Sequence, residues 1–131
     1  MDNYVKINEN NEVIDAVSLD KSDETKAQKW LSEKLGGTWL KTDAQTLRNE
    51  HLDGGQPFRG NFAGVGFTYD PDLDIFLSPK PFDSWVLDEN IADWVAPKQY
   101  PQDIFDEDGN VVKHYEWDED EVDWVEVQRE N

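Results

Sequence analysis

The chain has 131 residues, of which 30 are acidic and 12 are basic, so its formal net charge at pH 7 is −18. This charge excludes a general attraction to nucleic acid phosphates or to anionic membranes. Six Trp, four Tyr and six Phe are more aromatic residues than a disordered acidic tail would carry, and they allow a small core. We therefore expect one folded domain, residues 1–131, that binds neither nucleic acid nor membrane directly.

The absence of cysteine excludes disulfides and thiolate chemistry. The first residues contain no basic segment followed by an apolar run, so we expect no secretory signal. No stretch approaches the roughly 18 apolar residues that a membrane-spanning helix needs.

The first 42 residues predict a hairpin, a helix and a strand. Two apolar runs, residues 4–7 and 13–17, flank a polar turn and predict a hairpin over residues 4–19. Ser22 or Asp23 could cap the helix that follows, and the spacing of its apolar residues predicts that Trp30, Leu31 and Leu35 face the core. Gly36 and Gly37 end this helix, with the first glycine in the left-handed conformation, and residues 38–42 predict a strand.

Residues 43–59 are polar and rich in glycine, so we expect a long loop with a helical turn around residues 44–48. Loops of this length are uncommon in compact domains unless they are functional or disordered, which makes this segment a candidate for interaction. Residues 60–69 alternate small and large side chains and predict a strand with glycines on one face.

A large apolar residue followed by Asp or Asn, with a second large apolar residue seven positions after the first, recurs five times. The five pairs are Ile7 and Ile14, Tyr69 and Phe76, Leu87 and Trp94, Phe105 and Val112, and Trp117 and Trp124. The Asp or Asn side chain can accept a hydrogen bond from backbone just ahead of it, where the chain bends. The spacing therefore predicts a series of short hairpins, each with an apolar cross-strand pair.

A second regularity overlaps the first at an offset of eighteen residues. Phe76, Pro79, Lys80 and Phe82 recur as Trp94, Pro97, Lys98 and Tyr100. Because proline cannot donate to an interior ladder, the Pro-Lys pairs are interpreted as connectors between hairpins.

These patterns predict a mainly β protein with one short helix, of the α+β class, built from antiparallel hairpins in series. Residues 1–42 form its hairpin-helix-strand unit, residues 43–59 a loop, and residues 60–131 successive Trp-rich hairpins that extend toward the C-terminal end.

No motif predicts catalysis, a cofactor or a metal site. The histidines, His51 and His114, lie outside any metal-ligand spacing, and the glycines of residues 60–66 lack the lysine and helix of a phosphate-binding loop. The acidic segments at 106–110 and 118–121 lack the ligand pattern of a calcium-binding EF-hand. We expect a binding or structural protein rather than an enzyme.

Several segments together resemble a family of small proteins in tailed phages of marine bacteria, cyanophages above all. The segments are Gly36-Gly37-Thr38-Trp39, residues 59–70 (RGNFAGVGFTYD), residues 79–88 (PKPFDSWVLD) and Trp117-Asp118-Glu119. The resemblance covers most of residues 5–125 and is most specific over 59–88. The family has no established activity or catalytic residues, so none is carried over. It implies a setting in which small β-rich proteins decorate capsids, necks or tails.

The first functional hypothesis is therefore an accessory virion protein, which binds capsid, neck or tail proteins in many copies and leaves self-association open. The contact segments we expect are residues 49–59 and 79–82. The expected contact residues are His51, Phe58, Arg59, Lys80, Phe82, Asp118, Glu119, Asp120 and Glu121.

Two alternatives stay open. An acidic inhibitor could place carboxylates where nucleic acid phosphates sit on a basic host or phage protein, because seven of the eleven residues from 116 to 126 are acidic. A glycan-binding module could stack sugars on exposed indole rings, and its candidates are Trp85, Trp94, Trp117 and Trp124.

Overall fold

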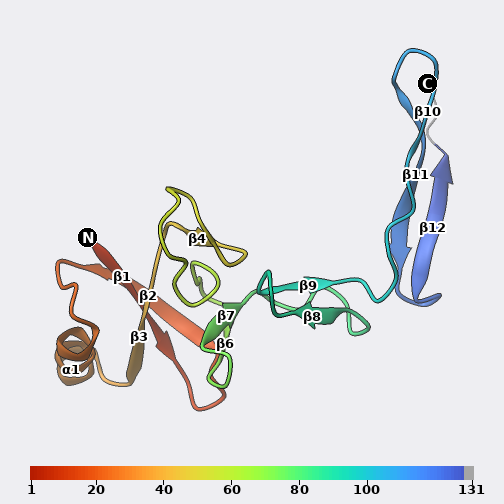
Figure 1. Ribbon diagram of the computed structural model, residues 1–131. Coiled ribbons are helices and arrows are strands. Elements are labelled where there is room, and N and C mark those ends of the chain that lie inside the picture. The colour runs from red at the N-terminus through yellow and green to blue at the C-terminus, as the bar shows by residue number, and fades with distance from the viewer. Residues whose placement is uncertain (129–131) are drawn as a thin grey trace. The chain divides into compact units, whose positions relative to one another are not determined.

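Residues 2–42 form a three-stranded antiparallel sheet and an α-helix in the computed structural model, which describes residues 1–128 (Figure 1). The sheet has the order β2-β1-β3. Its elements are β1 (Asp2–Ile7), β2 (Val13–Leu19), α1 (Glu24–Leu35) and β3 (Thr38–Thr42). The hairpin-helix-strand unit predicted from the sequence is confirmed.

The helix begins and ends where the sequence predicts. Asp23 is the cap, since its carboxylate accepts a hydrogen bond from the Lys26 backbone N–H at 3.0 Å. Gly36 follows the last turn with φ 74° and ψ 165°, a positive φ that glycine adopts without steric cost, and its N–H donates to the Ser32 carbonyl. The predicted left-handed conformation is therefore matched in φ but not in ψ.

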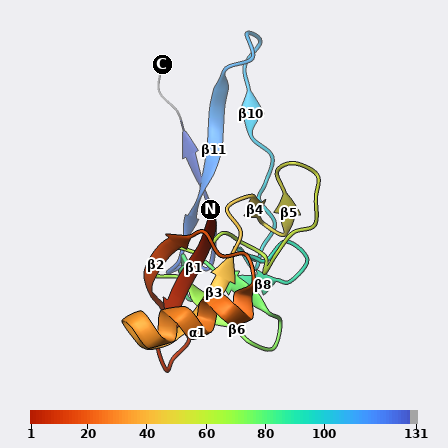
Figure 2. The ribbon, with the colours of Figure 1, turned by 90° about the vertical axis from the view of Figure 1, so that its left-hand side faces the viewer.

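The sheet of residues 2–42 carries apolar side chains on both of its faces. Toward α1, the buried residues are Tyr4, Ala27, Leu31 and Trp39, and Figure 2 looks onto this helix-covered face. On the other face, the buried residues are Val5, Val13, Ala63 and Phe76, which come from the sheet and from residues 60–77. Leu31 is buried as predicted, but the prediction was wrong for Trp30 and Leu35, which are 38% and 53% exposed, because α1 turns Ala27 and Leu31 inward.

Residues 43–93 form short hairpins rather than long strands. These are β4 (Thr46–Leu47) with β5 (Glu50–His51), β6 (Thr68–Asp70) with β7 (Ile75–Leu77), and β8 (Val86–Asp88) with β9 (Asp93–Val95). The helical turn predicted around residues 44–48 is wrong, because Arg48 and Asn49 both have positive φ and form the turn between β4 and β5.

The predicted strand over residues 60–69 is reduced to β6. Gly60 and Gly66 adopt positive φ, which interrupts an extended chain. The buried Asn61 amide instead donates to the carbonyls of Phe76 and Ala92, at 2.8 and 2.7 Å, and accepts from the Arg48 N–H at 2.8 Å. This side chain therefore joins three segments that are distant in the sequence.

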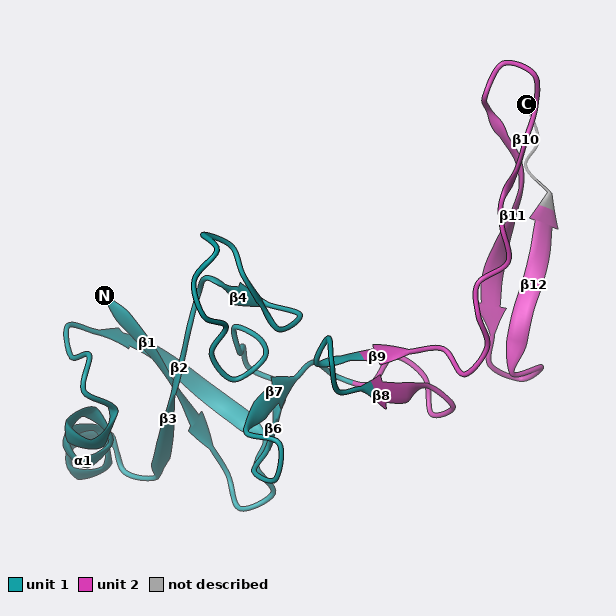
Figure 3. Ribbon diagram, in the orientation of Figure 1, with its two compact units in different colours: residues 1–79, 88–93 teal, residues 80–87, 94–131 magenta. Residues whose placement is uncertain are grey.

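The last sheet has the order β10-β11-β12 and consists of β10 (Ile104–Phe105), β11 (Val111–Asp118) and β12 (Asp123–Gln128). The chain divides into two compact units, shown in Figure 3: unit 1 is residues 1–79 and 88–93, and unit 2 is residues 80–87 and 94–131. All the buried apolar residues of the described chain belong to unit 1.

All five predicted Asx turns are present. In each, the side-chain oxygen of Asn8, Asp70, Asp88, Asp106 or Asp118 accepts a hydrogen bond from the backbone N–H two residues later. The cross-strand pairs Tyr69–Phe76 and Trp117–Trp124 also follow the prediction.

Two of the predicted cross-strand pairs are wrong by one residue. Ile7 lies opposite Val13 rather than Ile14, and Phe105 lies opposite Val111 rather than Val112, because each ladder carries a β-bulge there. The position of the positive-φ residue in the turn explains why these two hairpins carry a bulge. That residue is the third residue after Asn8 and Asp106 but the fourth after Asp70, Asp88 and Asp118.

A carboxylate covers a backbone N–H on the outer strand of each three-stranded sheet. Asp15 accepts from the Ala16 N–H on β2, and Asp123 accepts from the Trp124 N–H on β12, both at 2.8 Å. An edge strand with free N–H groups can pair with another chain, so these charged side chains oppose unwanted pairing.

The substitution Gly60→Ala tests the packing around Asn61. Gly60 has φ +76°, and an added Cβ would lie 2.9 Å from the Ala92 Cβ and 3.0 Å from the Ile75 Cβ. We expect the variant to lose about 1–3 kcal/mol in the free energy of unfolding, measured by urea denaturation. Gly66→Ala is the matched control, because Gly66 also has a positive φ, +99°, and nothing lies within 4 Å of its added Cβ. Equal losses in both variants would contradict this account.

Candidate binding surface on unit 2

The residues predicted as contacts fall into both units. His51, Phe58 and Arg59 belong to unit 1. The other six, Lys80, Phe82, Asp118, Glu119, Asp120 and Glu121, belong to unit 2.

His51 organises the loop that contains it. Its Nδ1 accepts hydrogen bonds from the N–H groups of Asp53 and Gly55, at 3.1 and 3.2 Å. Its Nε2 lies 3.6 Å from an Asp43 carboxylate oxygen, and its side chain is 17% exposed. The imidazole therefore directs its polar atoms into unit 1 rather than toward solvent.

Arg59 joins the helix, the sheet and a hairpin of unit 1. Its guanidinium donates to Glu24 at 2.5 Å, to the Lys41 carbonyl at 2.9 Å and to Asp74 at 3.0 Å. It also lies 4.8 Å from the centroid of the Phe58 ring. Because only 14% of the side chain is exposed, these internal bonds account for Arg59 and Phe58 without a partner.

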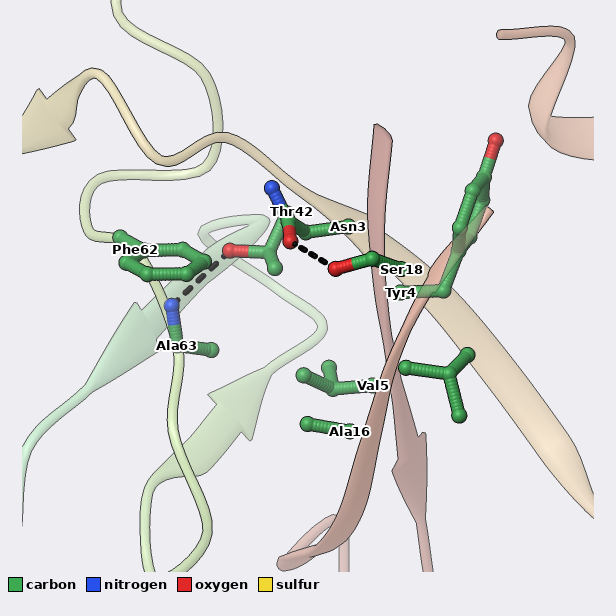
Figure 4. A pocket seen from close by; sticks show the side chains of 9 residues that line it. Asn3, Tyr4, Val5, Ala16, Ser18, Thr42, Phe62 and Ala63 are labelled. Carbon is green, nitrogen blue, oxygen red and sulfur yellow. Dashed lines mark hydrogen bonds between the residues drawn. The ribbon is translucent and has the colours of Figure 1, made fainter. Parts of the chain in front are cut away.

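A pocket of about 150 Å³ lies on unit 1 between the sheet and residues 62–63 (Figure 4). Its hydroxyl groups are already used: Thr42 accepts from the Ala63 N–H at 2.9 Å, and Ser18 donates to Asn3 at 2.9 Å. The pocket therefore presents no free catalytic group among the residues that line it.

Unit 2 carries a row of six aromatic rings on one face of the β11–β12 hairpin. Cross-strand partners share a face of a sheet, so Tyr115, Trp117 and Trp124 project from the same side. Three rings from preceding segments lie against them. The whole set, which we call the aromatic cluster, is Phe82, Trp85, Tyr100, Tyr115, Trp117 and Trp124.

Four of the seven ring pairs in the aromatic cluster meet edge to face, and the other three are tilted. Trp117 and Trp124 are 5.3 Å apart at 76°, and Tyr100 lies 4.9 Å from Trp124 at 82°. These geometries are favourable for aromatic pairs. They turn ring faces toward neighbouring rings, which favours packing within unit 2 over stacking on a sugar.

Among residues 80–87 and 94–127, no residue of unit 2 is fully buried. Phe82 and Tyr100 are 36% and 41% exposed. The indole N–H groups of Trp117 and Trp124 donate to Glu119 and to the Lys98 carbonyl, at 2.9 and 2.8 Å. The cluster is thus ordered by specific hydrogen bonds while much of its apolar surface stays accessible.

Glu119 fixes residues 80–85, the first connector, to the hairpin. Its carboxylate accepts from the Ser84 hydroxyl at 2.5 Å, from the Ser84 N–H at 2.9 Å and from the Trp117 indole. The pKa of Glu119 is held below its usual value. The largest cause is the hydrogen bond from the Ser84 hydroxyl, followed by the bond from the Trp117 indole, and the positive charge of Lys80 adds a smaller contribution. This predicted contact residue therefore has an internal role.

Residues 98–103, the second connector, contact both strands of the hairpin. The Tyr100 ring lies against Trp124 and Tyr115, and its hydroxyl accepts from the Tyr115 N–H at 3.2 Å. Lys98 Nζ lies 3.6 Å from Asp123. Lys98, Tyr100 and Ser84 were not among the predicted contact residues, although the eighteen-residue offset already relates the first two to Lys80 and Phe82.

The acidic turn after β11 divides into two kinds of residue. Asp118 uses its carboxylate to bond the N–H groups of Asp120 and Glu121, at 3.0 and 3.2 Å. Asp120 and Glu121 are exposed, and their own carboxylates form no hydrogen bond or ion pair within residues 1–128. Of the four predicted acidic contacts, only these two present free charge.

No group of three or more His, Asp or Glu side chains within residues 1–128 is placed to hold a metal ion. The described chain also has no helix with the length and hydropathy needed to cross a membrane. Comparison with protein-family models, curated proteins and solved structures gave no match.

The pH dependence of unit 2 tests the role of Glu119. Its lowered pKa means that its contribution to stability is complete above the usual glutamate pKa and is lost as the pH falls through the folded-state value. We expect near-ultraviolet circular dichroism of the Trp residues to weaken on that acidification, and Glu119→Gln to weaken it already at pH 7. Glu121→Gln is the control and should match the unmodified chain; if it weakens the signal equally, Glu119 has no special role.

Proposed function

We propose that this chain is a non-enzymatic binding protein that attaches through unit 2 to a structural protein of a phage particle. The observation that carries this proposal is the aromatic cluster, which is ordered by ring contacts and hydrogen bonds yet only partly buried. Unit 2 holds eight of the sixteen aromatic residues of the chain in 46 residues. A unit of this size without disulfides or a buried core depends on further apolar contact for its stability, and a partner supplies such contact.

The particle is proposed from the resemblance of residues 59–88 to proteins of marine tailed phages. The net charge of −18 supports it, because charge repulsion keeps crowded copies on a capsid, neck or tail from aggregating. In this proposal unit 1 is a folded support, and its residues His51 and Arg59 stabilise that support.

Quantitative mass spectrometry of gradient-purified particles tests the proposal. We expect the chain in a fixed ratio to the major capsid or tail protein, and a ratio at least tenfold lower for phage that encodes Trp117→Ala with Trp124→Ala. Leu47→Ala is the control, because Leu47 is 56% exposed on unit 1 and should not alter the ratio. A chain abundant in infected-cell lysate but missing from particles would refute the proposal.

The second candidate is an acidic inhibitor of a basic nucleic-acid-binding protein. The free carboxylates of Asp120 and Glu121 favour it, together with the thirteen acidic and four basic residues of unit 2. Such binding would weaken steeply with added salt.

The combined variant Asp120→Asn with Glu121→Gln separates this candidate from folding effects, since the Asp118 carboxylate supports the turn and the Glu119 carboxylate holds the first connector. Against a basic protein captured from infected cells, we expect the variant to lose affinity and to show a shallower salt dependence. Glu107→Gln with Asp108→Asn, in the turn after β10, is the control. Unchanged affinity in the first variant would reject the inhibitor.

A further inference from the structure

The two connectors of unit 2 bind the β11–β12 hairpin in the same manner. Each contains a lysine, one intervening residue and an aromatic ring: Lys80 with Phe82, and Lys98 with Tyr100. The Phe82 ring lies 6.5 Å from that of Trp117 on β11, and the Tyr100 ring lies 4.9 Å from that of Trp124 on β12. The cross-strand pair Trp117–Trp124 thus receives the Tyr100 ring from the second connector and the Phe82 and Trp85 rings from the first.

Each of the two lysines is associated with a carboxylate at one end of the turn between β11 and β12. Lys98 Nζ lies 3.6 Å from Asp123, at the start of β12. Lys80 Nζ lies 5.4 Å from the Trp94 ring centroid, and its positive charge helps to lower the pKa of Glu119, just after β11. Each binding position therefore combines an indole ring with a carboxylate.

We propose that the aromatic face of the β11–β12 hairpin is a recognition surface for segments with a lysine two residues before an aromatic ring. The chain's own connectors fill both positions, and the partner is a different, basic protein that presents the same kind of segment. Charge argues for a different protein, since two copies of a chain with net charge −18 repel each other. This inference rests on the binding role proposed for unit 2.

The connectors are only partly buried, so a segment of another protein can displace them from the hairpin. Phe82 and Tyr100 keep 36% and 41% of their surface exposed, and Lys98 and Asp123 are each more than half-exposed. A tethered segment acts at an effective concentration on the order of millimolar, so it competes with a partner's segment until that segment binds more tightly. The connectors thereby set the minimum affinity for the aromatic face that a partner's segment must have in order to displace them.

Emptying one position in the full chain tests the proposal. The probe is a peptide of residues 78–84 (SPKPFDS), which contains no Trp, and the readout is the Trp fluorescence of the chain. We expect the variant Lys80→Ala with Phe82→Ala to bind the peptide saturably, at least tenfold more tightly than the unmodified chain does. The same peptide with its Phe replaced by Ala should not bind.

The second position provides an independent version of the experiment. The variant Lys98→Ala with Tyr100→Ala should bind a peptide of residues 96–102 (APKQYPQ). If the Lys80→Ala, Phe82→Ala variant loses its β circular dichroism and is therefore unfolded, the result with this second variant tests the proposal instead. Failure of a folded variant to bind its peptide, or equal binding by the unmodified chain, would overturn the proposal.

Light scattering and particle analysis distinguish the remaining outcomes. We expect the unmodified chain to be monomeric; a dimer that disappears in the Lys80→Ala, Phe82→Ala variant would identify a second copy as the occupant and overturn the assignment to a different protein. Peptide binding by a chain missing from particles would overturn only the function proposed above. A chain present in particles whose emptied positions bind no peptide would overturn only this inference.

Discussion

A single local hydrogen bond, from a backbone N–H to the carboxyl or amide oxygen of the Asp or Asn two residues earlier, sets the form of most of this protein. It recurs in five turns, from Asn8 to Asp118. An Asx turn directs the chain back on itself without help from distant residues. The high content of Asp in the chain therefore has a structural part as well as an electrostatic one, and the hairpins that carry the aromatic cluster depend on it.

The two units use aromatic side chains differently. Unit 1 buries Tyr4, Trp39 and Phe76 and satisfies their polar atoms, as in the Tyr4 hydroxyl that donates to the Lys21 carbonyl at 2.6 Å. Unit 2 orders its rings by edge-to-face contacts and by the Glu119 carboxylate, without enclosing them. The first arrangement resembles an ordinary hydrophobic core, whereas the second leaves apolar area for another molecule.

The fold class and the turns could be predicted because their signals are local. Hairpin spacing, the Asp23 cap and the Asx residues all act within a few positions of the chain. The strand register at Ile7 and Phe105 could not be predicted. In these two hairpins the residue with positive φ comes one position earlier in the turn than in the other three, which shifts the pairing by one residue and leaves a β-bulge.

The parts that depend on distant residues could not be predicted either. The predicted strand over residues 60–69 gives way to the bonds of buried Asn61 to Phe76 and Ala92. The candidate site shows a similar limit: the long polar loop suggested Arg59 and His51 as contacts and the dense acid suggested Glu119. Long-range hydrogen bonds engage Arg59 and Glu119 within the protein, and bonds within the loop engage His51. The eighteen-residue offset was the better signal, because it pairs Lys98 and Tyr100 with Lys80 and Phe82.

The Asx turns also bear on the order in which the molecule folds. A hairpin closed by its own turn residues brings together positions close in sequence, so its chain-closure entropy is small and it can form within about 1–10 μs. The contact between Asn61 and Ala92 spans 31 residues and is slower to form. The β11–β12 hairpin, with Trp117 opposite Trp124, is thus able to fold before and apart from unit 1. During refolding, its aromatic face can therefore form before the connectors pack on it.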